Sequence, residues 1–193
     1  MADLITLARA QELPALAAVN AAYLAHLISA ASNAIERWCK RVFGTTIYTN
    51  EYYDGNGTDA MFLNNFPITT LTSIVVVEPD GTDTTLLGSG FDVSSETGEI
   101  KFERDCSTDY CYFPLGFHNL KANYTAGFAT VPEDVQEACA QYCVWLYAAD
   151  KTLPNVKSES LGDYAMSFAT GGTENDIPGS VKRLLTQYRN LRP

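Results

Sequence analysis

The middle of the chain, residues 45–129, limits the possible folds more than any other part of the sequence. It contains short segments rich in Thr, Val, Ile, Tyr and Phe, separated by turn signals such as residues 54–57 (Asp-Gly-Asn-Gly). These segments predict strands over residues 45–53, 60–63, 71–77, 90–94, 99–102 and 120–124. No pattern of helix length lies between them, and a parallel sheet needs crossover helices. We therefore expect an antiparallel β-module.

Helical patterns flank this module on both sides. In residues 20–42 apolar side chains recur at steps of three and four, and Asn20 is placed to cap the first turn. Residues 131–150 repeat the pattern behind Pro132, and a last helix is expected after Pro178. The buried stripe expected on the first of these helices consists of Leu24, Leu27, Ile28, Ala31, Ile35, Trp38 and Val42.

The sequence therefore predicts an α+β fold. We expect a mainly helical core, built from a long N-terminal helix, a central helix and a C-terminal helix, with an inserted antiparallel β-module and an extended arm. Residues 1–193 are interpreted as a single domain. Its segments are the N-terminal helices (1–44), the β-rich insert (45–129), the core helix (130–150), the extended arm or loop (151–176) and the C-terminal helix (177–193).

The arm carries apolar side chains that partly alternate with small ones. Tyr164, Met166 and Phe168 follow a period of two, which is typical of an extended segment, and Gly and Ser residues flank them. Two interpretations remain open. The arm can form an ordinary hairpin within the chain, or it can add a strand to a neighbouring chain through main-chain hydrogen bonds.

The net charge argues against a nucleic-acid-binding face. The chain carries 23 acidic and 13 basic side chains, a formal charge of −10, whereas phosphate binding needs clustered Lys and Arg. The acidity fits either simple solubility or a surface that repels DNA. Arg37, Lys40 and Arg41 are expected to complement the dipole at the end of the first helix, and Lys182, Arg183, Arg189 and Arg192 make the last helix the one basic patch.

The cysteines do not form a recognisable metal or disulfide framework. Cys106, Cys111 and His118 supply three candidate zinc ligands without a convincing fourth, and residues 54–59 fail the spacing of a calcium loop. We expect no bound metal and free thiols at Cys39, Cys106, Cys111, Cys139 and Cys143. Residues 13–31 are too weakly apolar for a membrane span, so a soluble protein is expected.

No catalytic pattern stands out. The chain has neither a Gly-x-Ser-x-Gly elbow nor a phosphate-binding Gly-x-x-x-x-Gly-Lys loop, and its acids are scattered. His26 and His118 lie in unlike contexts. We expect a structural protein without cofactors, and not an enzyme.

The order of several short motifs resembles one family over nearly the whole length. Residues 35–39 (Ile-Glu-Arg-Trp-Cys) end the first helical part, and residues 66–68 (Phe-Pro-Ile) lie in the β-rich insert. Residues 124–128 (Tyr-Thr-Ala-Gly-Phe) lead into residues 131–135 (Val-Pro-Glu-Asp-Val), and residues 158–164 (Ser-Glu-Ser-Leu-Gly-Asp-Tyr) follow before the last helix. This order resembles the head–tail connector, or adaptor, proteins of tailed bacteriophages and prophages.

The resemblance implies a structural role in the virion. Members of that family form a ring, typically of twelve subunits, beneath the portal protein at the neck of the particle. The ring continues the DNA channel, through which DNA passes without specific binding, and it docks the next neck or tail protein. The resemblance implies synthesis in the host bacterial cytoplasm and no membrane, catalysis or cofactor.

The arm and the basic last helix are the candidate contacts with a neighbouring subunit or the portal. The expected interface residues are Glu159, Ser160, Leu161, Gly162, Asp163, Tyr164, Met166, Phe168, Lys182, Arg183 and Arg189. An intrachain hairpin and a helix charged for solubility are the plainer interpretations. Other functions also remain open: another neck or tail component such as a tail terminator, or a small-ligand-binding protein or enzyme.

Overall fold

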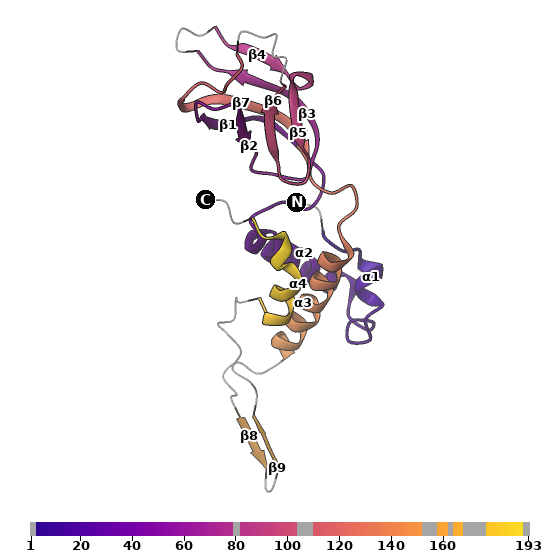
Figure 1. Cartoon of the computed structure of the whole chain (residues 1–193). Coiled ribbons are helices and arrows are strands. Elements are labelled where there is room, and N and C mark those ends of the chain that lie inside the picture. Colours follow the sequence, from indigo (N-terminus) through magenta and orange to yellow (C-terminus); the bar gives the residue numbers. More distant parts are fainter. Residues whose placement is uncertain are drawn as a thin grey trace. The chain divides into compact units, whose positions relative to one another are not determined.

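The structure is a computed structural model that describes residues 3–78, 82–103, 110–151, 158–161, 164–167 and 177–190. The chain forms two compact units (Figure 1). The helical unit consists of Met1–Lys40 and Val131–Pro193, and the β-unit consists of Arg41–Thr130. The fold is therefore α+β, as predicted.

The helical unit is built on two long helices. They are α2 (Ala21–Cys39) and α3 (Glu133–Lys151), and the shorter α1 (Leu7–Gln11), α4 (Gly179–Leu185) and the 3-10 turn η2 (Thr186–Tyr188) accompany them. The Asn20 side chain accepts hydrogen bonds from the amides of Ala22 and Tyr23, which confirms the predicted cap. The helix ends three residues before the expected end at Val42, because Lys40 adopts the left-handed conformation with φ 52°.

The core of this unit lies around α3, which packs against both α2 and α4, while α1 contacts α2 and α3 (Figure 1). Most of the predicted stripe of α2 is buried, including Leu24 and Ile35 at 0% exposure. The exceptions are Trp38, which is only half-buried, and Val42, which is half-buried and lies beyond the end of the helix. The facing buried residues are Val135, Ala138, Cys139, Tyr142 and Cys143 of α3 and Val181 and Leu185 of α4.

The β-unit contains two antiparallel sheets. The first has the strand order β1 (Thr46–Gly55), β7 (Gly116–Ala126), β3 (Ile68–Val76) and β4 (Thr84–Leu87). The second has the order β2 (Ala60–Phe62), β6 (Glu99–Phe102) and β5 (Phe91–Ser94), and the 3-10 turn η1 (Gly88–Gly90) precedes β5. All the predicted strands are present, whereas β4 was not predicted.

The expectation of a mainly helical core is not confirmed, because the β-unit has a hydrophobic core of its own. Residues from both sheets contribute to it, among them Ile74, Ile100 and Leu120 at 0% exposure. The rings of Phe91 and Phe113 each lie within 4.8 Å of the Phe102 ring, centroid to centroid. Such aromatic pairs add to the free energy gained from burying apolar area.

The sequence suggested that Arg41 extends the first helix, but the residue is instead buried in the β-unit. Its guanidinium lies over the Phe66 ring at 4.3 Å, with the rings of Phe43 and Phe128 at 5.4 and 5.3 Å, and it donates a hydrogen bond to the Phe66 carbonyl. The two ends of the unit meet here, because the Phe128 amide donates to the Phe43 carbonyl at 2.8 Å. Gly44 and Phe128 also form an isolated bridge.

The described part of the arm forms two short strands. Strand β8 (Ser158–Leu161) pairs antiparallel with β9 (Tyr164–Ser167), and Leu161 lies opposite Tyr164. The described part of the arm is thus extended, and its two strands pair with each other within one chain.

Candidate interaction surfaces

The predicted arm residues lie on the paired strands where they are described. Glu159 lies opposite Met166, Ser160 opposite Ala165, and Leu161 opposite Tyr164. Gly162, Asp163 and Phe168 lie outside the described residues. The backbone pairing places the described arm candidates on one ladder, and their role as an interface stays a prediction.

The C-terminal candidates lie around α4 and η2. Lys182 and Arg183 are in the last turns of α4, and Arg189 directly follows η2. The guanidinium of Arg189 lies over the ring of Trp38, 5.1 Å from its centroid. The Asn190 amide donates a hydrogen bond to the Cys39 carbonyl at 2.8 Å, so the C-terminal segment is bound to the end of α2.

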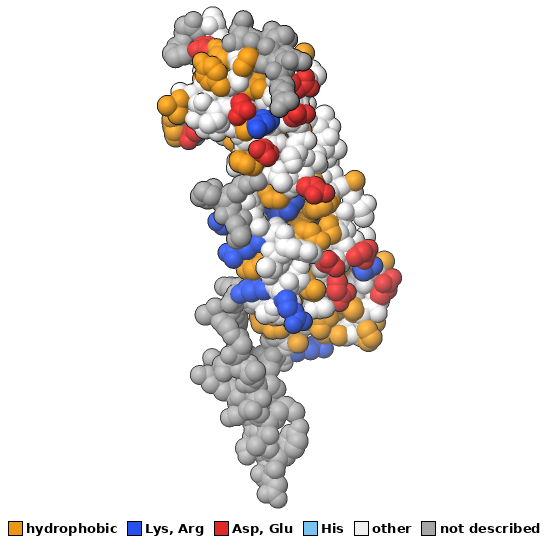
Figure 2. Space-filling model, in the orientation of Figure 1, with side chains coloured by type: hydrophobic (Ala, Val, Ile, Leu, Met, Phe, Trp, Pro, Cys, Tyr) orange, Lys and Arg blue, Asp and Glu red, His pale blue; other side chains and the backbone are white. Residues whose placement is uncertain are grey.

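This contact creates a basic surface that the sequence did not reveal. The exposed side chains of Arg37 and Lys40 belong to the last turn and cap of α2, and Arg189 joins them from the C-terminal segment. We use "basic surface" for Arg37, Lys40 and Arg189 around Trp38. The two basic groups are visible in the sequence, but only the tertiary contact through Trp38 and Cys39 brings them together. In Figure 2 most of the Lys and Arg side chains on the face shown lie on the helical unit.

The exposed large apolar side chains are distributed very differently. Among the described residues, all of those with high exposure belong to the β-unit, where Figure 2 shows hydrophobic side chains on the surface among acidic ones. They are Ile47, Tyr52, Phe62, Leu87, Val93, Tyr112, Leu115 and Phe117. Leu115 and Phe117 are the most exposed, at 82% and 79%, and they lie two residues apart. Exposed apolar residues close together are typical of a binding surface.

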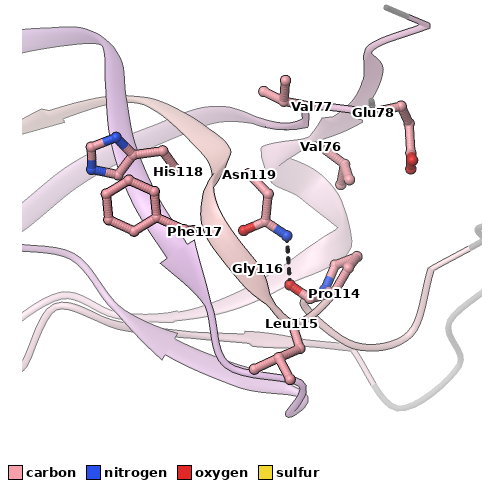
Figure 3. Close-up of a pocket in the computed structure, with 9 residues that line it drawn as sticks. All are labelled: Val76, Val77, Glu78, Pro114, Leu115, Gly116, Phe117, His118 and Asn119. Carbon is pink, nitrogen blue, oxygen red and sulfur yellow. Dashed lines mark hydrogen bonds between the residues drawn. The ribbon is translucent and has the colours of Figure 1, made fainter. Parts of the chain in front are cut away.

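Leu115 and Phe117 lie where the chain enters β7, in a segment that we call the apolar loop (residues 114–118, of which 116–118 begin the strand). The side-chain amide of Asn119 donates to the Pro114 carbonyl at 2.7 Å (Figure 3). Its oxygen accepts a hydrogen bond from the Gly55 amide at 2.8 Å. Position 55 requires glycine, because an added Cβ would lie 1.7 Å from the Pro114 carbonyl oxygen. Within one chain, Asn119 thus ties the start of the apolar loop to β1.

The neighbourhood of the apolar loop is acidic. It borders an open groove of about 450 Å³ whose lining includes Val76, Val77 and Glu78 (Figure 3), and none of the described residues that line it is Lys or Arg. The Asp54 carboxylate accepts a hydrogen bond from the His118 amide at 2.7 Å, and His118, at φ 50°, stacks on Phe117 with 4.0 Å between the ring centroids. Residues 41–130 hold 12 of the 23 acidic side chains but 4 of the 13 basic ones. The β-unit therefore carries a formal charge of −8.

The cysteine prediction is partly wrong. Cys39, Cys139 and Cys143 are free and buried, as expected, whereas Cys111 is disulfide-bonded. Cys111 lies in an exposed loop, where burial does not shield a thiol. A hydrogen bond with Cys139, together with burial, raises the pKa of the Cys143 thiol, so this thiol stays protonated and unreactive.

The geometry of the described residues does not point to a metal-binding or catalytic site. No three His, Cys, Asp or Glu side chains among them gather in a way that could hold a metal ion. In the rejected calcium loop, Asn56 instead donates to the Ala60 carbonyl and accepts from the Thr58 amide, which are hairpin contacts. Within the described residues, no helix has both the length and the apolar character that a membrane span requires.

Comparison with known proteins identifies the family. The model of the head completion protein family matches residues 3–191. Three similar solved chains come from "Neck of empty GTA particle computed with C6 symmetry", "Virion of native gene transfer agent (GTA) particle" and "Neck of native GTA particle computed with C12 symmetry". They are 17%, 18% and 19% identical, with TM-scores of 0.59, 0.55 and 0.56. The three matches cover 100%, 98% and 100% of this chain, and they cover 96%, 91% and 97% of the respective solved chains.

No curated protein matches the chain in a sequence comparison. The similar structures share its fold over almost their entire length. The family model alone spans nearly every residue. The chain therefore belongs to the head completion protein family, which confirms its resemblance to head–tail connector proteins.

Proposed function

We propose that this head–tail connector subunit assembles as a ring in the neck of a tailed phage or phage-like particle. The structural role follows from the family match over residues 3–191, the observation that carries the proposal. The family is one of structural phage proteins, which points away from catalysis. The chain would act through the surfaces it presents to its neighbours.

The ring is supported by the symmetry of the similar structures. Two of the three come from particle necks computed with C6 or C12 symmetry. A closed ring of identical subunits needs rotational symmetry of this kind. We propose twelve copies beneath the portal protein, with the next neck or tail protein docked on the other side.

The proposed DNA channel is supported by charge. The chain has a formal charge of −10, and phosphate binding needs clustered basic side chains. A wall of such subunits would let DNA pass with little non-specific binding. The described basic surface consists of only three side chains around Trp38, which suits a protein contact better than DNA binding.

The arm is proposed to strengthen the ring. Strands β8 and β9 pair with each other, and a two-stranded ribbon has two outer edges that can accept a further strand. We propose that Glu159, Ser160, Leu161, Tyr164 and Met166 lie at the contact with a neighbouring subunit or the portal, together with Gly162, Asp163 and Phe168.

The first test measures the mass of the purified chain alone and with its cognate portal protein, followed by electron microscopy of the mixture. We expect a ring seated on the portal. A variant lacking residues 157–168 should keep its circular dichroism spectrum but form fewer rings. A chain that never forms a ring, alone or on the portal, would refute the proposal. In particles, density at the end of the tail tube would indicate a tail terminator instead.

A further inference from the structure

A closed ring needs two different contact surfaces on every subunit. Each copy touches one neighbour through one patch and the other neighbour through another, because a head-to-tail contact is not self-complementary. The assignment of these two patches rests on the proposed ring. The distribution of charge and of exposed apolar side chains over the two units identifies them.

The first patch is the apolar loop of the β-unit. Leu115 and Phe117 project from a segment that Asn119 holds in place, so docking on it costs little conformational entropy. Asp54 and Glu78 flank the loop, and among the described residues that line the adjoining groove there is no Lys or Arg. A fitting partner must therefore offer both an apolar or aromatic side chain and positive charge.

The second patch is the basic surface of the helical unit, which has these two properties. Arg37, Lys40 and Arg189 supply the charge, and the half-buried ring of Trp38 lies beneath the Arg189 guanidinium. Trp and Arg are the residue types most enriched where interfaces gain their binding energy. The last segment, residues 177–190, contains Lys182, Arg183 and Arg189 but no acidic side chain.

We propose that the apolar loop of one subunit docks on the basic surface of the next subunit around the ring. Leu115 and Phe117 would cover Trp38, and the acidic flank of the loop would face the arginines. Contact between two β-units is disfavoured, because each carries a formal charge of −8. The proposed contact instead joins the most acidic and apolar part of one copy to the most basic part of another.

Two full-length variants, each with altered charge in one of the two patches, test this contact when they are assayed alone and as a mixture. The first variant combines Arg37→Glu with Arg189→Glu, and the second combines Leu115→Lys with Phe117→Lys. Each variant alone should form at least about tenfold fewer rings on the portal, because like charges then face each other. An equal mixture should restore the rings, because in an alternating, even-numbered ring every contact again joins opposite charges.

Matched controls change the same charges elsewhere. Lys101→Glu with Lys151→Glu makes the chain as acidic as the first variant. Ile47→Lys with Leu87→Lys replaces two other exposed apolar side chains, which are 76% and 68% exposed. Both controls should form rings at wild-type yield, with the mass of the assemblies as the readout.

Each outcome is decisive. Rings from each variant alone would overturn the contact while leaving the proposed function intact. Variants that fail alone and also fail together would overturn it too, and would assign the two patches to the portal or to contacts within one chain. A wild-type chain that forms no ring would refute the proposed function and this contact with it.

Discussion

Two tyrosine hydroxyls and one carboxylate meet inside the β-unit. The hydroxyls of Tyr53 and Tyr124 lie 3.1 Å apart, and both donate hydrogen bonds to Glu51. The Asn64 amide and the Asn65 side chain donate to these hydroxyls in turn, which binds the loop after β2 to the first sheet. Burial raises the pKa of both tyrosines above the ordinary value of 10.0.

These tyrosines should make stability fall in alkali. The folded chain keeps both phenolic protons where the unfolded chain releases them, so this contribution is fully present below about pH 10 and is lost above it. Urea denaturation between about pH 8.5 and 11 should show a smaller loss of unfolding free energy for Tyr53→Phe than for the wild type. Equal losses in the two proteins would contradict this account.

Trp38 should contribute less to stability than its place in the apolar stripe suggests. A fully buried Trp would cost about 3–5 kcal/mol when replaced by Ala, but Trp38 is half-buried, so we expect about 1–2 kcal/mol. Ile35→Ala on the same helix is the matched control, since Ile35 is 0% exposed. Urea denaturation that gives equal costs for the two variants would place Trp38 in the core after all.

At the scale of elements, the apolar loop depends on the side chain of one residue. Asn119 bridges Pro114 and Gly55 with two hydrogen bonds. Asn119→Ala leaves both backbone groups without this partner and should lower the unfolding free energy by about 1–3 kcal/mol. Hydrogen exchange should show the Gly55 amide losing protection more than amides in α3. An unchanged Gly55 amide would mean that other contacts hold the loop.

The sequence predicted helix boundaries correctly where interactions between residues close in the chain determine them. The apolar period and the Asn20 side chain predicted the start of α2 correctly. Its end was misplaced because Lys40 takes a left-handed conformation more common for glycine, and Gly44 looked like the stop signal. Strand β4 was not predicted, and its pairing with β3 decides its structure.

The candidate surfaces were less predictable because they depend on tertiary contacts. The charges of Lys182, Arg183 and Arg189 are visible in the sequence, but the packing of Arg189 on Trp38 is not. The exposure of Leu115 and Phe117 was missed entirely, since apolar residues in a strand-rich segment are usually assigned to a core. The three-dimensional structure shows that a segment tied down by Asn119 presents Leu115 and Phe117 to solvent, which distinguishes these two residues from core residues.

At the scale of the whole molecule, the β-unit has the features of an independent folding unit. It has its own core, and its two ends meet through Gly44 and Phe128. We expect residues 41–130 alone to unfold cooperatively, because the fragment falls within the usual size of a domain. Circular dichroism and amide dispersion in a two-dimensional NMR spectrum would check this. A collapsed, undispersed spectrum would show that the helical unit is required.

The meeting of these ends also has a consequence for how such genes can change. A segment whose first and last residues are hydrogen-bonded neighbours, as Phe43 and Phe128 are, can be replaced by another segment with a similar distance between its ends. Recombination at the codons that flank residues 41–130 would then exchange the whole β-unit and leave α2 and α3 unaltered. Related genomes should accordingly differ most in length and composition between these two points.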